Sequence, residues 1–162
     1  MAQFLVTGGS GFIGSHLCRK LLGEGHGVRV LDNLSSGKRE NLSDIADDID
    51  FLEADLLDED ALQRAVKGVE YVLHHAAVAS VQTSVEQPLM EQQINSVGTL
   101  RLLEAARQAG VRRVVFAASA AAYGNDPRVP KREDMRPTPE SPYAISKLVG
   151  EYYCGAYSRL YG

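Results

Sequence analysis

The chain has 162 residues, of which 44% are hydrophobic and 23% charged, and its formal net charge is -4 at pH 7. This length and composition predict one globular domain with a sizeable core rather than a disordered chain. The charge gives no basic footprint for nucleic acid, and no run of about 18 apolar residues predicts a membrane span. The chain has two cysteines, Cys18 and Cys154, and its first residues lead directly into a predicted strand, which predicts no signal peptide. We therefore expect reduced thiols and a cytoplasmic location.

Short apolar runs alternate with segments of helical spacing along the chain. The runs predict five strands, which in chain order are Gln3–Thr7, Val28–Asp32, Ile49–Asp55, Glu70–Ala77 and Val111–Ser119. The helical segments begin at Phe12, Asp58, Pro88 and Pro142. The third of these helices is expected to run to Ala109, where Gly110 stops it. This alternation favours an α/β fold of Rossmann type, a doubly wound parallel sheet with helices on both faces.

The segment "TGGSGFIG" (Thr7–Gly14) places glycines between the first strand and the first helix. Glycines alone are also typical of a flexible turn, but here backbone N–H groups and a helix N-terminus are placed to meet a diphosphate. Asp32 ends the second strand, where a carboxylate accepts from both adenosine ribose hydroxyls and repels a 2′-phosphate, which favours NAD over NADP. Lys38 and Arg39 would soften that preference, unless they form an exposed turn. Asp55 is placed to meet the adenine.

The segment "SPYAISK" carries a candidate catalytic pair. Tyr143 and Lys147 are four residues apart, so they share one face of a helix, with Ser141 as N-cap and Pro142 at its first position. An ammonium group and the positive helix end both stabilise a phenolate, which predicts that Tyr143 acts as a base. A surface pair with no catalytic role is the alternative. Ser119 is either a proton relay or a serine that ends its strand.

Several segments in chain order carry a family resemblance: "TGGSGFIG", "LDNLSSGK", "ADLLD", "HHAA", "INSVGTLRLLEAAR", "FAASAAAYG" and "SPYAISK". They resemble the extended short-chain dehydrogenase/reductases, in particular the nucleotide-sugar epimerases of the UDP-glucose 4-epimerase type. The resemblance implies that Tyr143 takes the proton of the sugar 4-hydroxyl, with Ser119 as relay and Lys147 holding the phenolate and the nicotinamide ribose. Hydride passes to NAD and returns to the other face of a 4-keto sugar.

The resemblance also implies which residues surround each ligand. Besides Tyr143 and Lys147, the cofactor is expected to be held by Gly8, Gly11, Phe12, Ile13, Gly14, Asp32, Asn33, Ser35, Ser36, Gly37, Asp55, Leu56, His75, Ala76, Ala77 and Asn95. The UDP-sugar substrate is expected at Ala79, Ser80, Val81, Ser84, Ser119 and Tyr143. Ala120 and Ala121 stand where related 4,6-dehydratases carry an acid, which favours epimerisation over dehydration. His74 and His75 point to opposite faces of a strand, so no metal site is expected.

Members of this family are about twice as long as the present chain. Residues 1–162 are therefore expected to form the NAD-binding Rossmann domain alone, without the part that holds the sugar. Two alternatives to an active epimerase stay open: a stand-alone NAD-binding module with little catalysis, and a chain completed by a partner. The family also pairs through its two long helices, so we expect a homodimer through Pro88–Ala109 and Pro142–Leu160. Leu100, Leu103, Tyr152 and Tyr153 are candidates for that seam, unless they pack on their own sheet.

Overall fold

The computed structural model describes residues 1–162, and the chain divides into two compact units. The first unit comprises residues 1–76 and 101–117, and the second comprises residues 77–100 and 118–162. The assignment of the whole chain to one domain stays a prediction. None of the helices combines the length and the apolar character that crossing a membrane requires.

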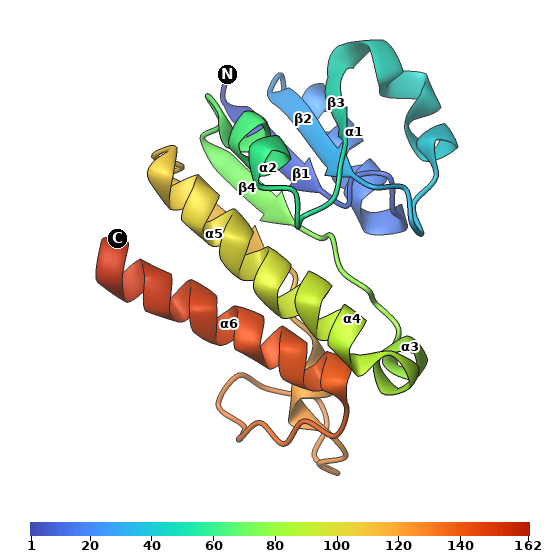
Figure 1. Ribbon diagram of the computed structural model, residues 1–162, viewed down its shortest axis with the longest axis vertical. Coiled ribbons are helices and arrows are strands. Elements are labelled where there is room, and N and C mark those ends of the chain that lie inside the picture. The colour runs from blue at the N-terminus through green and yellow to red at the C-terminus, as the bar shows by residue number, and fades with distance from the viewer. The chain divides into compact units, whose positions relative to one another are not determined.

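A five-stranded parallel sheet forms the centre of the first unit (Figure 1). Its strands are β1 (Gln3–Thr7), β2 (Gly27–Asp32), β3 (Ile49–Glu53), β4 (Tyr71–His74) and β5 (Arg113–Phe116). They lie in the order β3-β2-β1-β4-β5, which confirms the predicted Rossmann-like sheet. Thr7 pairs with Leu31 on one side and with His74 on the other, so three strands end at the same level. The order reverses between β1 and β4, the point at which open α/β sheets bind ligands.

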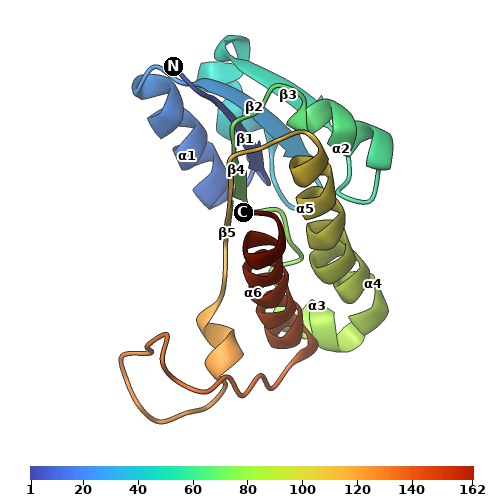
Figure 2. The same ribbon diagram turned by 90° about the vertical axis from the view of Figure 1, so that its left-hand side faces the viewer.

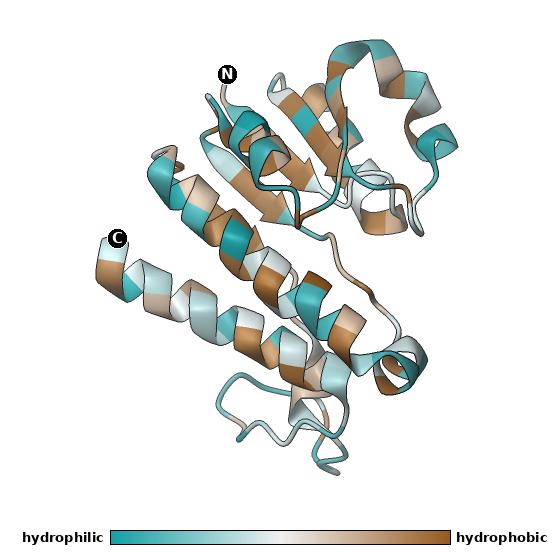
Figure 3. Cartoon of the chain, in the orientation of Figure 1, coloured by the Kyte–Doolittle hydropathy of each residue, from teal (hydrophilic) through white to brown (hydrophobic).

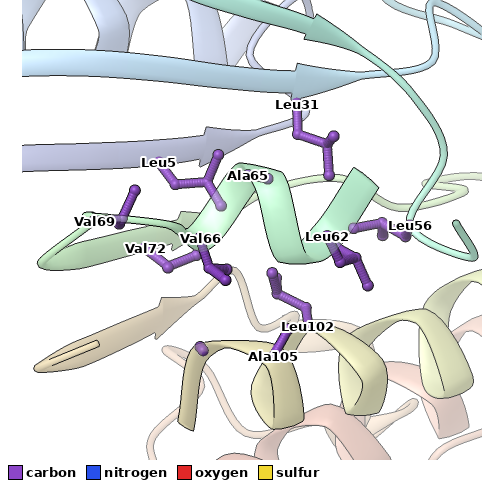
Figure 4. Close-up of a cluster of buried hydrophobic side chains, with 11 residues drawn as sticks. Leu5, Leu31, Leu56, Leu62, Ala65, Val66, Val69, Val72, Leu102 and Ala105 are labelled. Carbon is purple, nitrogen blue, oxygen red and sulfur yellow. The ribbon is translucent and has the colours of Figure 1, made fainter. Parts of the chain in front are cut away.

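Helices cover both faces of this sheet (Figure 2). One face packs against α1 (Phe12–Gly23) and the 3-10 helix η1 (Arg39–Asp48) through a buried cluster of Val6, Cys18, Leu21, Val28, Val30 and Leu42. The other face packs against α2 (Glu59–Val66) and the part of α5 (Gly98–Gln108) that follows residue 100. Figure 4 shows the second cluster, made of Leu5, Leu31, Leu56, Leu62, Ala65, Val66, Val69, Val72, Leu102, Ala105 and Ala106.

Burial on both faces explains why the strands are almost continuously apolar in sequence. Leu5 and Val6 are neighbours in β1 and both are fully buried, one in each cluster. Successive side chains of a strand point to opposite faces, so a central parallel strand needs apolar residues at every position. Figure 3 shows this apolar character along β1, β2 and β4.

The second unit is helical. It contains α3 (Val81–Glu86), α4 (Pro88–Gln92), the π-helical segment η2 (Gln93–Val97), the 3-10 turn η3 (Ala120–Tyr123) and α6 (Pro142–Tyr161). α6 packs against α3, α4, η2 and η3. The segment that leads from η3 to α6 is tied back to η3, because the backbone N–H of Thr138 donates to the carbonyl of Ala122 at 2.9 Å.

Candidate functional site

The glycine loop lies between β1 and α1, as predicted, and its glycines are required by close backbone approaches. Gly8 has φ +70°, and a Cβ there would lie 2.7 Å from the backbone N of Ala76. A Cβ at Gly14 would lie 2.2 Å from the carbonyl oxygen of Gly8. α1 begins after Gly11 with no capping side chain and no acidic residue in its first turn. Its first N–H groups therefore suit an anionic ligand.

Asp32 is joined directly to this loop. Asp32 is 8% exposed, and its carboxylate accepts the backbone N–H groups of Ser10 and Leu34, each at 2.8 Å. The carbonyl of Ser10 accepts in turn from the backbone N–H of Lys38 and from the side-chain amide of Asn41. The loops that follow β1 and β2 thus hold one another. The hydroxyl of Ser10 is buried and has no hydrogen-bond partner within the chain.

The loop after β2 carries the other residues expected near the adenosine. Asn33, Ser35 and Ser36 are exposed, and the side-chain oxygen of Asn33 accepts the backbone N–H of Ser35 at 3.0 Å. Gly37 lies against Ser10, where a Cβ would come within 2.8 Å of the Ser10 Cβ. At the start of α1, Phe12 is 79% exposed. Ile13 beside it is 58% exposed.

The ends of β3 and β4 complete this edge of the sheet. Asp55 accepts from the side-chain amide of Asn33 at 2.7 Å and from the backbone N–H of Leu57 at 2.9 Å. The side chain of Leu56 packs in the core instead. Thr7 Oγ1 accepts the backbone N–H of Ala76 at 3.2 Å and lies 2.7 Å from Nδ1 of His74.

The two adjacent histidines differ in burial. His74 is buried and His75 is partly exposed, in line with their predicted positions on opposite faces. No group of three or more His, Cys, Asp or Glu side chains is placed to hold a metal ion. All the first-unit residues expected at the cofactor thus lie at or beside the carboxyl ends of β1 to β4, and their contact with a cofactor stays a prediction.

The candidate catalytic pair lies at the start of α6, in the second unit. Ser141 accepts the backbone N–H of Ala144 at 3.1 Å, and Pro142 is the first helical residue, as predicted. The Nζ of Lys147 lies 5.9 Å from the centroid of the Tyr143 ring. Lys147 is 4% exposed, and this burial lowers the pKa of its ammonium group, while the carboxylate of Glu91 raises it.

Three other predicted residues of this unit serve as helix caps or tethers. Ser119 caps η3, where its hydroxyl oxygen accepts the backbone N–H of Ala121 at 3.2 Å. Ser80 caps α3 by accepting from Thr83 at 3.1 Å. Asn95 accepts the backbone N–H of Val78 at 2.8 Å and donates to its carbonyl at 3.1 Å. Asn95 thereby fixes the segment that follows β4.

The residues expected at the sugar differ in accessibility. Ala79 is exposed, and so is Val81 at the start of α3. Ser84 is fully buried, and its hydroxyl donates to the carbonyl of Val81 at 2.6 Å. Ala77 lies partly exposed just after β4. The roles of these residues towards a cofactor or a sugar stay predictions.

Sequence reasoning missed three residues at these positions: Ser10, Glu91 and Ser146. Glu91 is fully buried in α4 and Ser146 in α6, and their side-chain oxygens lie 2.5 Å apart. Ser146 precedes Lys147 in "SPYAISK", so its place on the buried side of the helix was open to prediction. Nothing in the sequence distinguishes Glu91 from the exposed acids of an amphipathic helix.

The family model described as "NAD dependent epimerase/dehydratase family" matches residues 4–162. The chain belongs to this family. It is 47% identical over 161 residues to a UDP-glucose 4-epimerase of Mycolicibacterium smegmatis, covering 97% of this chain and 51% of that protein. The family assignment expected from the motifs is thus confirmed.

Solved structures of the same family share the fold. A UDP-glucose 4-epimerase of Thermotoga maritima, solved with UDP-glucose, has a TM-score of 0.92 and 43% identity over 99% of this chain and 52% of its own. The enzyme of Thermus thermophilus, solved with NAD, has a TM-score of 0.92 and 45% identity over the same shares, 99% and 52%. The chain spans about half the length of the relatives it matches.

Proposed function

We propose that this chain carries the cofactor-binding and proton-transfer residues of an NAD-dependent UDP-sugar 4-epimerase. The observation that carries the proposal is that this chain, a member of the family, combines two features. Its glycine loop is hydrogen-bonded to Asp32, and Tyr143 and Lys147 lie together at the start of α6. Relatives described as UDP-glucose 4-epimerases support the reaction and the substrate class. Glucose and galactose forms of the UDP-sugar are the expected pair.

The residues of the first unit fit a dinucleotide. Gly8 and Gly14 have no side chains, so backbone rather than side chains lies at the start of α1. The N–H groups at this end of the helix suit a diphosphate. The buried hydroxyl of Ser10 lacks a partner within the chain, so a ligand acceptor or donor would satisfy it. The carboxylate of Asp32 favours a ribose with a free 2′-hydroxyl, hence NAD. When bound, NAD supplies the acceptance and return of hydride at the sugar C4.

The residues of the second unit supply proton transfer. Tyr143 lies in the first turn of α6, where the helix dipole stabilises a phenolate, and the ammonium of Lys147 beside its ring adds to this. Tyr143 would take the proton of the sugar 4-hydroxyl and return it after the 4-keto sugar has turned over. Ser119 would relay that proton. Ala120 and Ala121 follow it, so η3 offers no carboxyl group to support elimination of water.

Replacement of Tyr143 by Phe tests this proposal against a module that only binds NAD. If Tyr143 is the base, Tyr143→Phe lowers turnover of UDP-galactose by about two to four orders of magnitude. Its affinity for NAD+ stays within about threefold, since a ring of the same shape remains. Tyr161→Phe, at an exposed tyrosine near the end of the same helix, is the matched control and keeps full turnover. A folded wild-type chain that binds NAD+ yet shows no turnover supports the binding module instead.

We also propose a homodimer through α6 and the helix of residues 88–108, in a cytoplasmic location. Tyr152 is 63% exposed and remains a candidate for the seam, whereas Leu103 is 5% exposed. If the seam is correct, Tyr152→Lys shifts the chain from dimer to monomer in sedimentation velocity, whereas Lys20→Glu on α1 leaves the dimer unchanged. A wild-type chain that sediments as a monomer at high concentration would contradict the proposal.

A further inference from the structure

Glu91 is a fully buried carboxylate held by three side chains in the second unit. Ser146 donates to its Oε1 at 2.5 Å, and the side-chain amide of Asn95 also donates to Oε1. The side-chain amide of Gln92 donates to Oε2 at 2.9 Å. The two amides can only donate through their NH₂ groups, while the hydroxyl of Ser146 also lies 2.9 Å from the carbonyl of Tyr143. Glu91 is therefore tied by hydrogen bonds to its own helix and to α6.

This carboxylate reaches α6 at the turn that carries the candidate catalytic pair. α4 lies beside the start of α6 (Figures 1 and 2), and Gln92 also donates to the carbonyl of Pro142 at 2.9 Å. Ser146, the donor from α6, lies between Tyr143 and Lys147 in sequence and is adjacent to Lys147. Glu91 thus bonds to the same helical turn that positions both functional side chains.

Lys147 is also buried, at 4% exposure. A buried ammonium is expensive unless an opposite charge accompanies it, because burial favours the neutral amine. Glu91 is a buried carboxylate in the element packed against this turn, and it raises the pKa of Lys147 against the effect of burial.

We propose that Glu91 is a positioning residue that fixes the first turns of α6 through Ser146 and provides the counter-charge of the buried Lys147 ammonium. The link to proton transfer by Tyr143 rests on the proposed epimerase function. The proposed interaction between the Glu91 carboxylate and the Lys147 ammonium does not rest on that function, because it concerns the chain without cofactor or sugar.

The other titratable groups near this turn belong to α3, η3 and α6, whereas Glu91 is the carboxylate that raises the pKa of Lys147. α3 carries Glu86, which is exposed and accepts from Gln82 at 2.8 Å. η2 carries no titratable side chain, and η3 carries only Tyr123. On α6 itself, Glu151 follows Lys147 by four residues, and burial raises the pKa of its carboxyl.

The test is an NMR titration of the full chain labelled with ¹³C at the lysine ε carbon, with the Lys147 signal assigned through Lys147→Arg. If Glu91 is the counter-charge, Glu91→Gln lowers the pKa of Lys147 by about one unit or more. Glu91→Asp keeps the charge and lowers it less. Glu86→Gln, which removes an exposed acid from the same unit, leaves it unchanged. A folded Glu91→Gln chain with the wild-type pKa at Lys147 would overturn the proposal.

A second measurement decides the matter if Glu91→Gln fails to fold. The ¹³Cδ chemical shift of Glu91 in the wild-type chain shows whether its carboxyl is ionised at pH 7. An ionised group supports the proposal, and a protonated group overturns it. Neither readout requires NAD or turnover, so an inactive chain would refute the proposed function without affecting this result.

Discussion

The carboxylate of Asp32, at the end of β2, accepts the backbone N–H of Ser10 in the glycine loop at 2.8 Å. Its other oxygen accepts the N–H of Leu34, a residue with φ of 57°, also at 2.8 Å. One buried side chain thus fixes the loops that follow two neighbouring strands. The residue expected to select the cofactor ribose therefore also shapes the loop expected to hold the diphosphate.

Substitution of Asp32 by Asn is expected to disturb both loops. An amide offers only one oxygen, so one of the two N–H groups would face an NH₂ group and stay unpaired. We expect a loss of about 1–3 kcal/mol in the free energy of unfolding. We also expect at least about tenfold weaker NAD+ binding, measured by calorimetry. Asp47→Asn, an exposed acid in η1, is the control and changes neither quantity. Wild-type affinity and stability in Asp32→Asn would contradict this account of the loop.

Gly14→Ala tests the close packing of the glycine loop. The added Cβ would lie 2.2 Å from the carbonyl oxygen of Gly8, which belongs to the backbone and cannot rotate away. We expect NAD+ binding to be lost, with a loss of about 1–3 kcal/mol in stability. Gly23→Ala, at the end of the same helix, meets nothing within 4 Å. The control should be neutral or up to about 1 kcal/mol more stable in urea unfolding. Equal behaviour of the two variants would show that the loop is looser than the structure indicates.

Arg29 should contribute more to stability than the exposed arginines. From β2 it donates to carbonyls at the end of α2, those of Ala65 and Lys67, at 2.9 and 2.8 Å. The last carbonyls of a helix have no partner within it, and a positive charge at this end interacts favourably with the negative end of the helix dipole. We expect Arg29→Met to lower the free energy of unfolding by about 1.5–3 kcal/mol. Arg112→Met, whose ion pair with Glu70 is largely exposed, should change it by less than about 1 kcal/mol. Equal changes in the free energy of unfolding for Arg29→Met and Arg112→Met would contradict the larger contribution of Arg29.

Cys18 should make the stability of the chain depend on pH in alkaline solution. Burial raises the pKa of its thiol from 9.0 to about 12. The unfolded chain loses this proton above pH 9, while the folded chain keeps it, so stability falls as pH rises from 9 towards 12. The slope is about half of 1.4 kcal/mol per pH unit at pH 9 and approaches that full value above about pH 10. In urea unfolding between about pH 9 and 10.5, Cys18→Ala should show a slope shallower by about 1 kcal/mol per pH unit on average. Parallel slopes for the two chains would contradict the prediction.

The sheet is predictable from sequence because the interior of each central strand is apolar. Leu5 and Val6 mark β1, and the predicted bounds, Gln3–Thr7, are those of the structure. Strand ends are less accurate: the third ends at Glu53 rather than Asp55, and the fifth spans Arg113–Phe116 rather than Val111–Ser119. Apolar character continues past the last ladder bond, because loop residues at this edge are also partly buried.

The helices of the second unit are harder to predict. Sequence reasoning misses α3 (Val81–Glu86) because Val81, Thr83 and Val85 are β-branched and disfavour a helix locally. Its N-cap at Ser80 compensates. The predicted helix from Pro88 to Ala109 is correct in extent to within one residue, but its π-helical segment is not foreseen. Periodicity does not show where a turn widens.

The site is predictable where the backbone dictates it. The glycines directly follow a strand, which predicts a tight loop. Ser141 and Pro142 predict the start of a helix at α6. The buried contact between Glu91 and Ser146 is not predictable, because the two residues are far apart in sequence and meet only when α4 packs against α6.

The central claim is that the glycine loop binds NAD. A calorimetric titration with NAD+, after any bound cofactor has been removed from the chain, tests it most directly. We expect one-to-one binding to the wild-type chain, with clearly weaker binding of NADP+ because of the Asp32 carboxylate, and no binding to Gly14→Ala. A folded wild-type chain that binds neither dinucleotide would contradict the assignment of the glycine loop as a cofactor site.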